Sequence, residues 1–186
     1  MSEYENRVLK MLTSSEEKFK SAFEITNHFN KVKKQLVIKF WKNVEEELNK
    51  LITDSDETFK VKLDSDVFHS NSKCFLYLDN KTEARFLYEH LSTNQCMGLW
   101  YENQKFNTQK IDSFRNEFQN EITYYTKQTW WISFKNLDEN FSNFESLLMI
   151  LPENAEVYSK SKAQDLFDFA VENKTHLQYI INNCLK

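Results

Sequence analysis

The strongest pattern in the sequence is a hydrophobic stripe in its first third. Four apolar residues recur there at intervals of four positions: Leu36, Phe40, Val44 and Leu48. This spacing places them along one side of a helix, and such a side must pack against other apolar groups. We therefore predict a long helix over residues 30–52, with Trp41 beside the stripe.

Two shorter helical segments are predicted ahead of that helix. One covers residues 4–12. The other begins near Ser15, because a serine followed by Glu16 and Glu17 is typical of a helix N-terminus. The apolar side of this second segment consists of Phe19, Phe23 and Phe29.

The periodicity changes after residue 57. Phe59, Val61 and Leu63 alternate with polar residues, as they would on a half-buried strand over residues 58–64. Three more strands are predicted at residues 74–78, 85–91 and 96–101. Since the polar links between these segments are short, we expect the strands to be antiparallel neighbours.

The last part of the chain predicts one more strand and then helices. The elements are a helix over residues 108–121, an aromatic strand over 124–134, an apolar segment over 147–151 and a closing helix over 161–184. This order implies an α+β fold: an antiparallel sheet of four to five strands, covered on one face and flanked by N-terminal helices and a C-terminal helix.

The chain contains no internal repeat, low-complexity tract or linker, so we predict a single domain over residues 1–186. Its parts are a helical N-terminal region, a mostly β region with one helix and a pair of C-terminal helical segments, at residues 1–52, 58–134 and 143–186.

The composition excludes several classes of enzyme. With one glycine, Gly98, and one proline, Pro152, the chain has no glycine-rich loop to hold a phosphate, as Walker-type, dinucleotide-binding and kinase-type enzymes require. Turns must therefore be formed by Asn, Asp and Ser. The formal net charge of −4 argues against broad electrostatic binding of nucleic acid and leaves a local basic patch open.

The cysteines and the apolar runs bear on cofactors and location. Three cysteines far apart in the sequence, with no close histidine or second cysteine, are predicted to be reduced core residues: Cys74, Cys96 and Cys184. We accordingly expect neither a metal nor a cofactor. No apolar run approaches the ~20 residues that span a bilayer, and the polar, acidic start does not resemble a secretory signal. We predict a cytoplasmic protein with no membrane partner.

One pattern suggests an enzyme. Asp64 or Asp66 after one predicted strand, and Asp79-Asn80-Lys81 after the next, would suit a small metal-dependent nuclease, in which acids hold magnesium beside a lysine. The same acid-x-lysine pattern also recurs in predicted helices, and Asp79-Asn80 is a strong turn signal. We favour the turn and predict no catalytic residues.

The histidines are isolated from one another and from other soft ligands at helical spacing. They are His28, His69, His90 and His176. His90 follows Glu89 on a predicted strand, where adjacent side chains point to opposite faces and cannot pair.

A group of lysines lies on the predicted long helix. On a helical wheel an arc of about 140° opposite the apolar stripe contains Lys31, Lys34, Lys39 and Lys42. Such an arc could follow a phosphate backbone. However, Glu45 and Glu46 share the arc and would form intrahelical ion pairs, so we favour a solvated face and treat the lysines as a secondary binding patch.

The aromatic segment over residues 124–134 is the most prominent candidate for binding. On a strand, Trp130 and Trp131 face opposite sides, so one enters the core and the other needs a second cover. That cover is a helix of the same chain, a partner protein or a stacked base. Because Trp and Tyr dominate binding hot spots, the predicted binding residues are Trp130 or Trp131, with Trp100 and Tyr101.

Three segments carry a resemblance to a known family. They are Phe40-Trp41-x-x-Val44-Glu45-x-x-Leu48, Gly98-Leu99-Trp100-Tyr101 and Trp130-Trp131-Ile132-Ser133-Phe134-Lys135-Asn136-Leu137. In this order they resemble the C-terminal accessory region of bacterial PD-(D/E)XK nuclease-superfamily proteins, over about residues 30–185. The resemblance implies a chain without the nuclease core, with a role in partner or target recognition in a bacterial or phage defence system.

The predicted function is therefore a non-catalytic binding or regulatory module, with another protein as its partner in a bacterial or phage nucleic-acid-related system. Two alternatives are open. One is the metal-dependent nuclease with Asp66, Asp79 and Lys81. The other is direct nucleic-acid binding, in which the lysines contact phosphates and an exposed aromatic residue stacks on bases.

Overall fold

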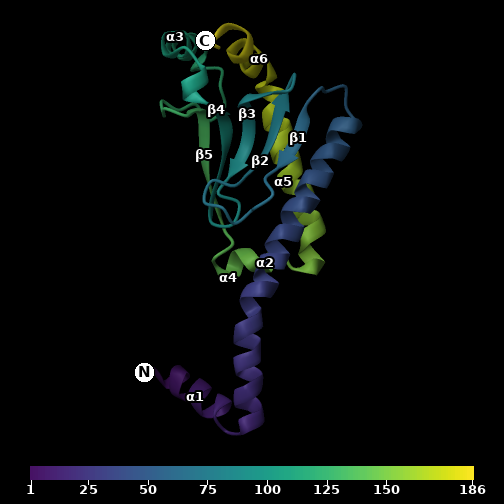
Figure 1. Cartoon of the computed structure of the whole chain (residues 1–186), viewed down its shortest axis with the longest axis vertical. Coiled ribbons are helices and arrows are strands. Elements are labelled where there is room, and N and C mark those ends of the chain that lie inside the picture. The colour runs from purple at the N-terminus through teal and green to yellow at the C-terminus, as the bar shows by residue number, and fades with distance from the viewer. The chain divides into compact units, whose positions relative to one another are not determined.

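The computed structural model describes all 186 residues. It shows an α+β fold whose five strands form one antiparallel sheet in the order β1-β2-β3-β4-β5, so each strand pairs with the next one in the sequence (Figure 1). The predicted fold class is confirmed. The chain forms two compact units, Met1–Leu36 and Val37–Lys186.

The N-terminal unit is helical and contains no buried residue. Helix α1 covers Glu3–Leu12 and begins with a capping box, in which Ser2 and Glu5 bond to each other's backbone N–H. The Ser15 hydroxyl then accepts a hydrogen bond from the Lys18 N–H at 3.2 Å, as the N-terminal pattern predicted.

Helix α2 covers Glu16–Thr53, so the two helices predicted over this stretch are one. No glycine or proline interrupts residues 16–53, and nothing therefore ends the first segment. The predicted apolar side of the N-terminal segment is exposed to solvent: Phe19, Phe23 and Phe29 are 58%, 62% and 53% exposed.

Four of the five predicted strands are present, with ends that differ from the predicted ones by up to four residues. The strands are β1 Lys60–Leu63, β2 Lys73–Leu78, β3 Lys81–Glu89, β4 Asn94–Tyr101 and β5 Trp131–Asn140. The fifth prediction was wrong in its bounds, because the strand begins at Trp131, near the end of the predicted segment. Tyr125 makes a single antiparallel bridge to Ser133 instead of forming a strand.

Asp79 and Asn80 form the turn between β2 and β3. Both have positive φ, 52° and 59°, as a two-residue type I′ hairpin turn requires. Asn and Asp are the side-chain-bearing residues that tolerate this conformation best. The interpretation of this dipeptide as a turn is confirmed.

The remaining helices lie after β4 and β5. They are the short 3-10 turn η1 Asn103–Lys105, α3 Thr108–Phe118, α4 Phe144–Leu148, α5 Pro152–Glu172 and α6 Lys174–Asn183. The closing helix therefore starts earlier than predicted, since Pro152 suits the first turn of a helix. It is also divided in two at Asn173.

The core lies between one face of the sheet and the helices of the C-terminal unit. Trp41 on α2 is fully buried and donates its indole N–H to the Leu91 carbonyl at 2.8 Å. Tyr88 on β3 donates its hydroxyl to the Lys162 carbonyl on α5 at 3.0 Å, and Phe86 packs edge-on against Phe169. These contacts place α2 and α5 on the face that carries Phe86 and Tyr88. No helix of the structure is both long and apolar enough to cross a membrane.

Candidate functional site

The opposite face of the sheet carries the candidate site, and we call it the open face. Side chains alternate along a strand, so the residues that flank Phe86 and Tyr88 in β3, such as Arg85 and Leu87, point to this face. The register continues the face across the sheet. Its cross-strand pairs are Phe75–Leu87, Arg85–Trp100, Glu89–Cys96 and Trp100–Trp131.

Four planar groups stack on one another on the open face. The Arg85 guanidinium lies 4.4 Å from the ring centroid of Phe75 and 4.5 Å from that of Trp100. Trp130 then stacks on Trp100, with centroids 6.3 Å apart and planes 10° apart. We call Phe75, Arg85, Trp100 and Trp130 the arginine–aromatic stack. Each member packs against its neighbour, which restricts the side-chain rotations that a partner would otherwise have to fix.

The Arg85 side chain makes no hydrogen bond or salt bridge in the chain, and its buried Nε–H has no acceptor. Burial lowers the pKa of Arg85, while the charges of Asp64, Glu102, Glu89 and Glu83 raise it less. The guanidinium stays charged, since arginine ionises far above neutral pH. Its faces are covered by rings and its N–H edges are unused, which is the geometry of a receptor for a planar anion such as a carboxylate.

The four predicted aromatic binding residues have different surroundings. Trp130 is 39% exposed and Trp100 is half-buried, so both present ring surface to solvent. Trp131 is only 6% exposed, because it packs in a cluster with Phe75, Leu87 and Cys96. Tyr101 is 2% exposed and lies in the core, edge-on to Phe106 at 5.6 Å.

The expectation that Trp130 and Trp131 face opposite sides was wrong. Strand β5 begins at Trp131, so the alternation does not include Trp130, which stacks on Trp100. Trp131 is the cross-strand partner of Trp100. Trp130 and Trp131 therefore both contact Trp100 of β4, on the same face of the sheet.

The four predicted lysines are exposed side chains of α2. Lys31 and Lys34 belong to the N-terminal unit, and Lys39 and Lys42 to the C-terminal unit. Glu45 does not form the expected intrahelical pair: its carboxylate accepts the Leu63 N–H at 3.0 Å and holds β1 to α2. A role of the lysines in binding stays a prediction.

The residues of the nuclease alternative are not brought together. Asp66 follows β1 and lies near the start of β2, where its carboxylate accepts the Phe68 N–H at 2.9 Å. Asp79 and Lys81 lie beyond the other end of β2. Because β2 has six residues, about 20 Å of strand separates the two ends. One metal ion cannot bridge that distance.

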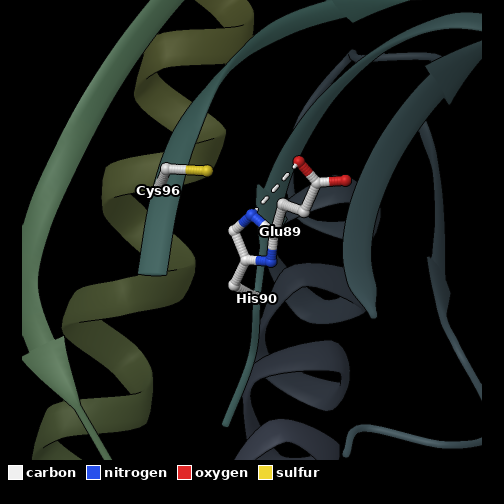
Figure 2. Close-up of side chains that lie close together, drawn as sticks. All are labelled: Glu89, His90 and Cys96. Atoms are coloured by element: carbon white, nitrogen blue, oxygen red, sulfur yellow. Dashed lines mark ion pairs between the residues drawn. The ribbon is translucent and has the colours of Figure 1, made fainter. Parts of the chain in front are cut away.

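A second group of reactive side chains lies at the end of the open face. Glu89, His90 and Cys96 come from the end of β3, the residue after it and the start of β4, and their ligand atoms all lie within 4.8 Å of one another. Figure 2 shows the Cys96 thiol and the Glu89 carboxylate on the two sides of the His90 ring. Burial, and then the charge of Glu89, raises the pKa of the Cys96 thiol to about 12. These are the residues that could hold a metal.

The sequence prediction that Glu89 and His90 cannot pair was wrong. Strand β3 ends at Glu89, and His90 has a φ of 60°, so the strand alternation stops before the histidine. Its Nε2 lies 3.8 Å from the Glu89 carboxylate. The sequence feature that could have predicted this group is the short link between β3 and β4, because a tight hairpin brings Cys96 opposite Glu89.

Comparison with known proteins gives no relative for this chain. No family model matches it, and neither does any curated protein or solved structure. The resemblance to the accessory region of the PD-(D/E)XK nuclease superfamily therefore stays a prediction.

Proposed function

We propose that this chain is a non-catalytic binding module that docks another protein on the arginine–aromatic stack. The single observation that carries the proposal is the Arg85 guanidinium held between Phe75 and Trp100 with no anionic partner of its own. A half-buried cation whose donors have no acceptor in the chain gains when a partner supplies one.

The composition of the stack supports a protein partner. Tryptophan and arginine are the residues most enriched at binding hot spots, and they are most effective where neighbouring groups keep them rigid. Trp130 forms the outer end of the stack and is the member with an exposed ring. It offers an apolar anchor beside the cationic one at Arg85.

The charges around the stack favour a peptide carboxylate over a nucleic-acid backbone. Four acidic residues act on Arg85: Asp64, Glu83, Glu89 and Glu102. They repel every anion that approaches, so the electrostatic penalty is smaller for a partner that brings one carboxylate to the guanidinium edge than for a run of phosphates. Lys73, whose Nζ lies 5.8 Å from the Trp100 ring centroid, is already paired with Glu89 at 2.7 Å. We therefore assign the site to a protein segment with an acidic residue next to an apolar one.

A peptide-display selection on the full chain tests the proposal without knowledge of the natural partner. Selected peptides should contain Asp or Glu beside an apolar residue. Their affinity should fall about 10-fold or more, which is 1.4 kcal/mol, in Trp130→Ala and in Arg85→Gln. Phe144→Ala is the matched control, because Phe144 is an aromatic residue of α4 that is 65% exposed and is separated from Trp130 by the ten residues of β5.

Two results would contradict the proposal. One is a set of selected peptides that binds Trp130→Ala and Arg85→Gln as tightly as the unmodified chain. The other is tight, salt-dependent binding of a single-stranded oligonucleotide that the same two changes abolish, which would assign the stack to nucleic acid. The wider assignment to a bacterial or phage defence system depends on the family resemblance alone and is tested by the identity of the natural partner.

A further inference from the structure

Three side chains of types that bind transition metals meet where β3 leads into β4. Glu89 and Cys96 are cross-strand partners in the antiparallel register, so both point to the open face. His90 follows Glu89 directly and closes the group. A carboxylate oxygen and a thiol sulfur thus come from two adjacent strands, and an imidazole nitrogen comes from the first residue of the link between them.

The histidine is held with one ring nitrogen toward the other two ligands. Its Nδ1 contacts the Ser70 carbonyl oxygen, and its backbone N–H donates to the Ser72 carbonyl at 3.0 Å. A hydrogen bond from Nδ1–H to a carbonyl fixes the tautomer that leaves the Nε2 lone pair free, and metal-binding histidines are commonly oriented in this way.

The carboxylate is oriented as well. Lys73 binds one oxygen of Glu89 at 2.7 Å, and the other oxygen lies 3.8 Å from His90 Nε2. The Glu89 side chain is 13% exposed. Only one of its oxygens is therefore engaged, and the second faces the histidine (Figure 2).

The backbone at His90 is strained. A φ of 60° is uncommon for any residue other than glycine, and strain of this kind is concentrated at functional sites. Hydrogen bonds to the loop that contains Ser70 and Ser72 hold the residue in this conformation.

We propose that Glu89, His90 and Cys96 form a binding site for a divalent transition-metal ion of the zinc class. In tetrahedral coordination with ordinary zinc distances, the ligand atoms would lie about 3.3–3.5 Å apart. The three ligand atoms already lie within 4.8 Å of one another. Side-chain movements of roughly 1 Å therefore bring them to the distances that one zinc ion requires. A thiol and an imidazole select zinc or cobalt over magnesium or calcium. When the sulfur–metal bond forms, the thiol loses its proton to solvent.

Three protein ligands leave a fourth position for water or for a group from outside the chain. The site is separate from the arginine–aromatic stack, and its assignment does not depend on the proposed function. The sequence predicted no metal site, because Cys96 and His90 are six residues apart. The register of the β3–β4 pair is what brings them together.

Metal binding by the untagged full chain tests the assignment. Equilibrium dialysis with Zn²⁺ should give one bound ion per chain. Titration with Co²⁺ should give the intense thiolate-to-cobalt charge-transfer band and the visible ligand-field bands of a tetrahedral site. In Cys96→Ala, Glu89→Gln and His90→Asn, the affinity for Zn²⁺ should fall about 100-fold or more. The cobalt bands of the tetrahedral site should disappear in the same three variants. Asparagine is chosen at position 90 because it tolerates positive φ.

Matched controls separate the cluster from other residues of the same types. Cys184→Ser and His69→Gln should bind cobalt as the unmodified chain does, since neither residue belongs to the cluster. If Cys96→Ala fails to fold, the metal affinity of His90→Asn decides the test, provided that its circular dichroism spectrum matches that of the unmodified chain. The assignment is overturned if the unmodified chain binds neither ion, if the cobalt complex lacks the thiolate band, or if a folded His90→Asn binds as tightly as the unmodified chain.

Discussion

Gly98 and Ser133 approach each other so closely that no other residue fits at position 98. A β-carbon there would lie 2.0 Å from the Ser133 carbonyl oxygen. The contact occurs beside an irregularity in the β4–β5 register, where Leu99 pairs with Ser133 and Trp100 pairs with Trp131. The extra residue on β5 is Ile132, and it returns Phe134 to the same face as Trp131. The one glycine of the chain therefore positions the aromatic side chains of the open face.

Replacement of Gly98 by alanine should destabilise the fold strongly. The added methyl group meets backbone atoms, which cannot rotate away, so we expect a loss of about 3 kcal/mol in the free energy of unfolding. Urea denaturation measures it. Thr82→Ala, at an exposed position of β3, is the control and should stay within about 0.5 kcal/mol of the unmodified chain. Equal stability of the two variants would show that β4 and β5 do not approach so closely.

The two neighbouring tryptophans should respond differently to truncation. Trp131 is buried in the cluster with Phe75 and Leu87, so Trp131→Ala should cost about 3–5 kcal/mol. Trp130 lies at the surface end of the stack, and Trp130→Ala should cost about 1 kcal/mol or less. Thermal and urea unfolding of both variants give these values. A large loss in Trp130→Ala would mean that this residue is part of the core.

Much of the fold follows from the sequence. The stripe predicts the buried side of α2 at three of its four positions: Phe40, Val44 and Leu48 are all 1% exposed or less, while Leu36 is half-buried. Strict alternation predicts β1, and two turn-forming residues predict the link from β2 to β3. These signals are local, so a short window of sequence contains them.

The candidate sites could not be predicted in the same way, because they depend on pairing between strands. Arg85 has no unusual sequence neighbour, and only the register places it between Phe75 and Trp100. His90 was predicted as a strand residue because the end of β3 carries no glycine or proline to mark it. Boundaries of this kind are set by tertiary contacts, here by the hydrogen bond from His90 to Ser72.

A buried ion pair between β5 and α5 should make stability depend on pH. Lys162, 5% exposed, binds Glu139 at 2.5 Å, and the Tyr158 hydroxyl donates to the same carboxylate at 2.6 Å. Burial by itself would raise the pKa of Glu139, but the hydrogen bonds from Lys162 and Tyr158 outweigh it and lower the pKa below its ordinary value. A carboxylate with a lowered pKa in the folded state stabilises the fold above its unfolded pKa and loses this contribution as the pH falls.

The variant Glu139→Gln separates the two parts of this effect. At neutral pH it leaves Lys162 buried without a counter-charge and should cost about 3 kcal/mol. Between pH 6 and 3 (roughly the range over which carboxylates titrate) its stability should fall less steeply than that of the unmodified chain. Urea unfolding across this range measures both. Glu156→Gln, which removes an exposed pair with Lys160, is the control and should follow the unmodified chain. An identical pH dependence in Glu139→Gln would contradict the assignment.

The hydrogen bond from Trp41 to Leu91 should contribute to the attachment of α2 to the sheet. Trp41→Phe keeps an aromatic ring but removes the shorter of two hydrogen bonds to the Leu91 carbonyl, the other being from the Gln95 amide at 3.5 Å, for an expected loss of about 1 kcal/mol. Calorimetry would detect it as a lower Tm. The same substitution at Trp130, whose indole N–H makes no hydrogen bond in the chain, should leave the Tm nearly unchanged. Equal shifts for the two variants would show that the Trp41 hydrogen bond adds nothing.

The most direct test of the proposed binding surface is to observe the four tryptophans while a selected peptide binds. Each indole N–H gives one signal in a ¹H–¹⁵N correlation spectrum, and single Trp→Phe variants assign the four signals. We predict that the peptide shifts the signals of Trp100 and Trp130. The signal of Trp41, which is buried between α2 and the opposite face of the sheet, should not move. A peptide that binds and moves neither Trp100 nor Trp130 would contradict the account.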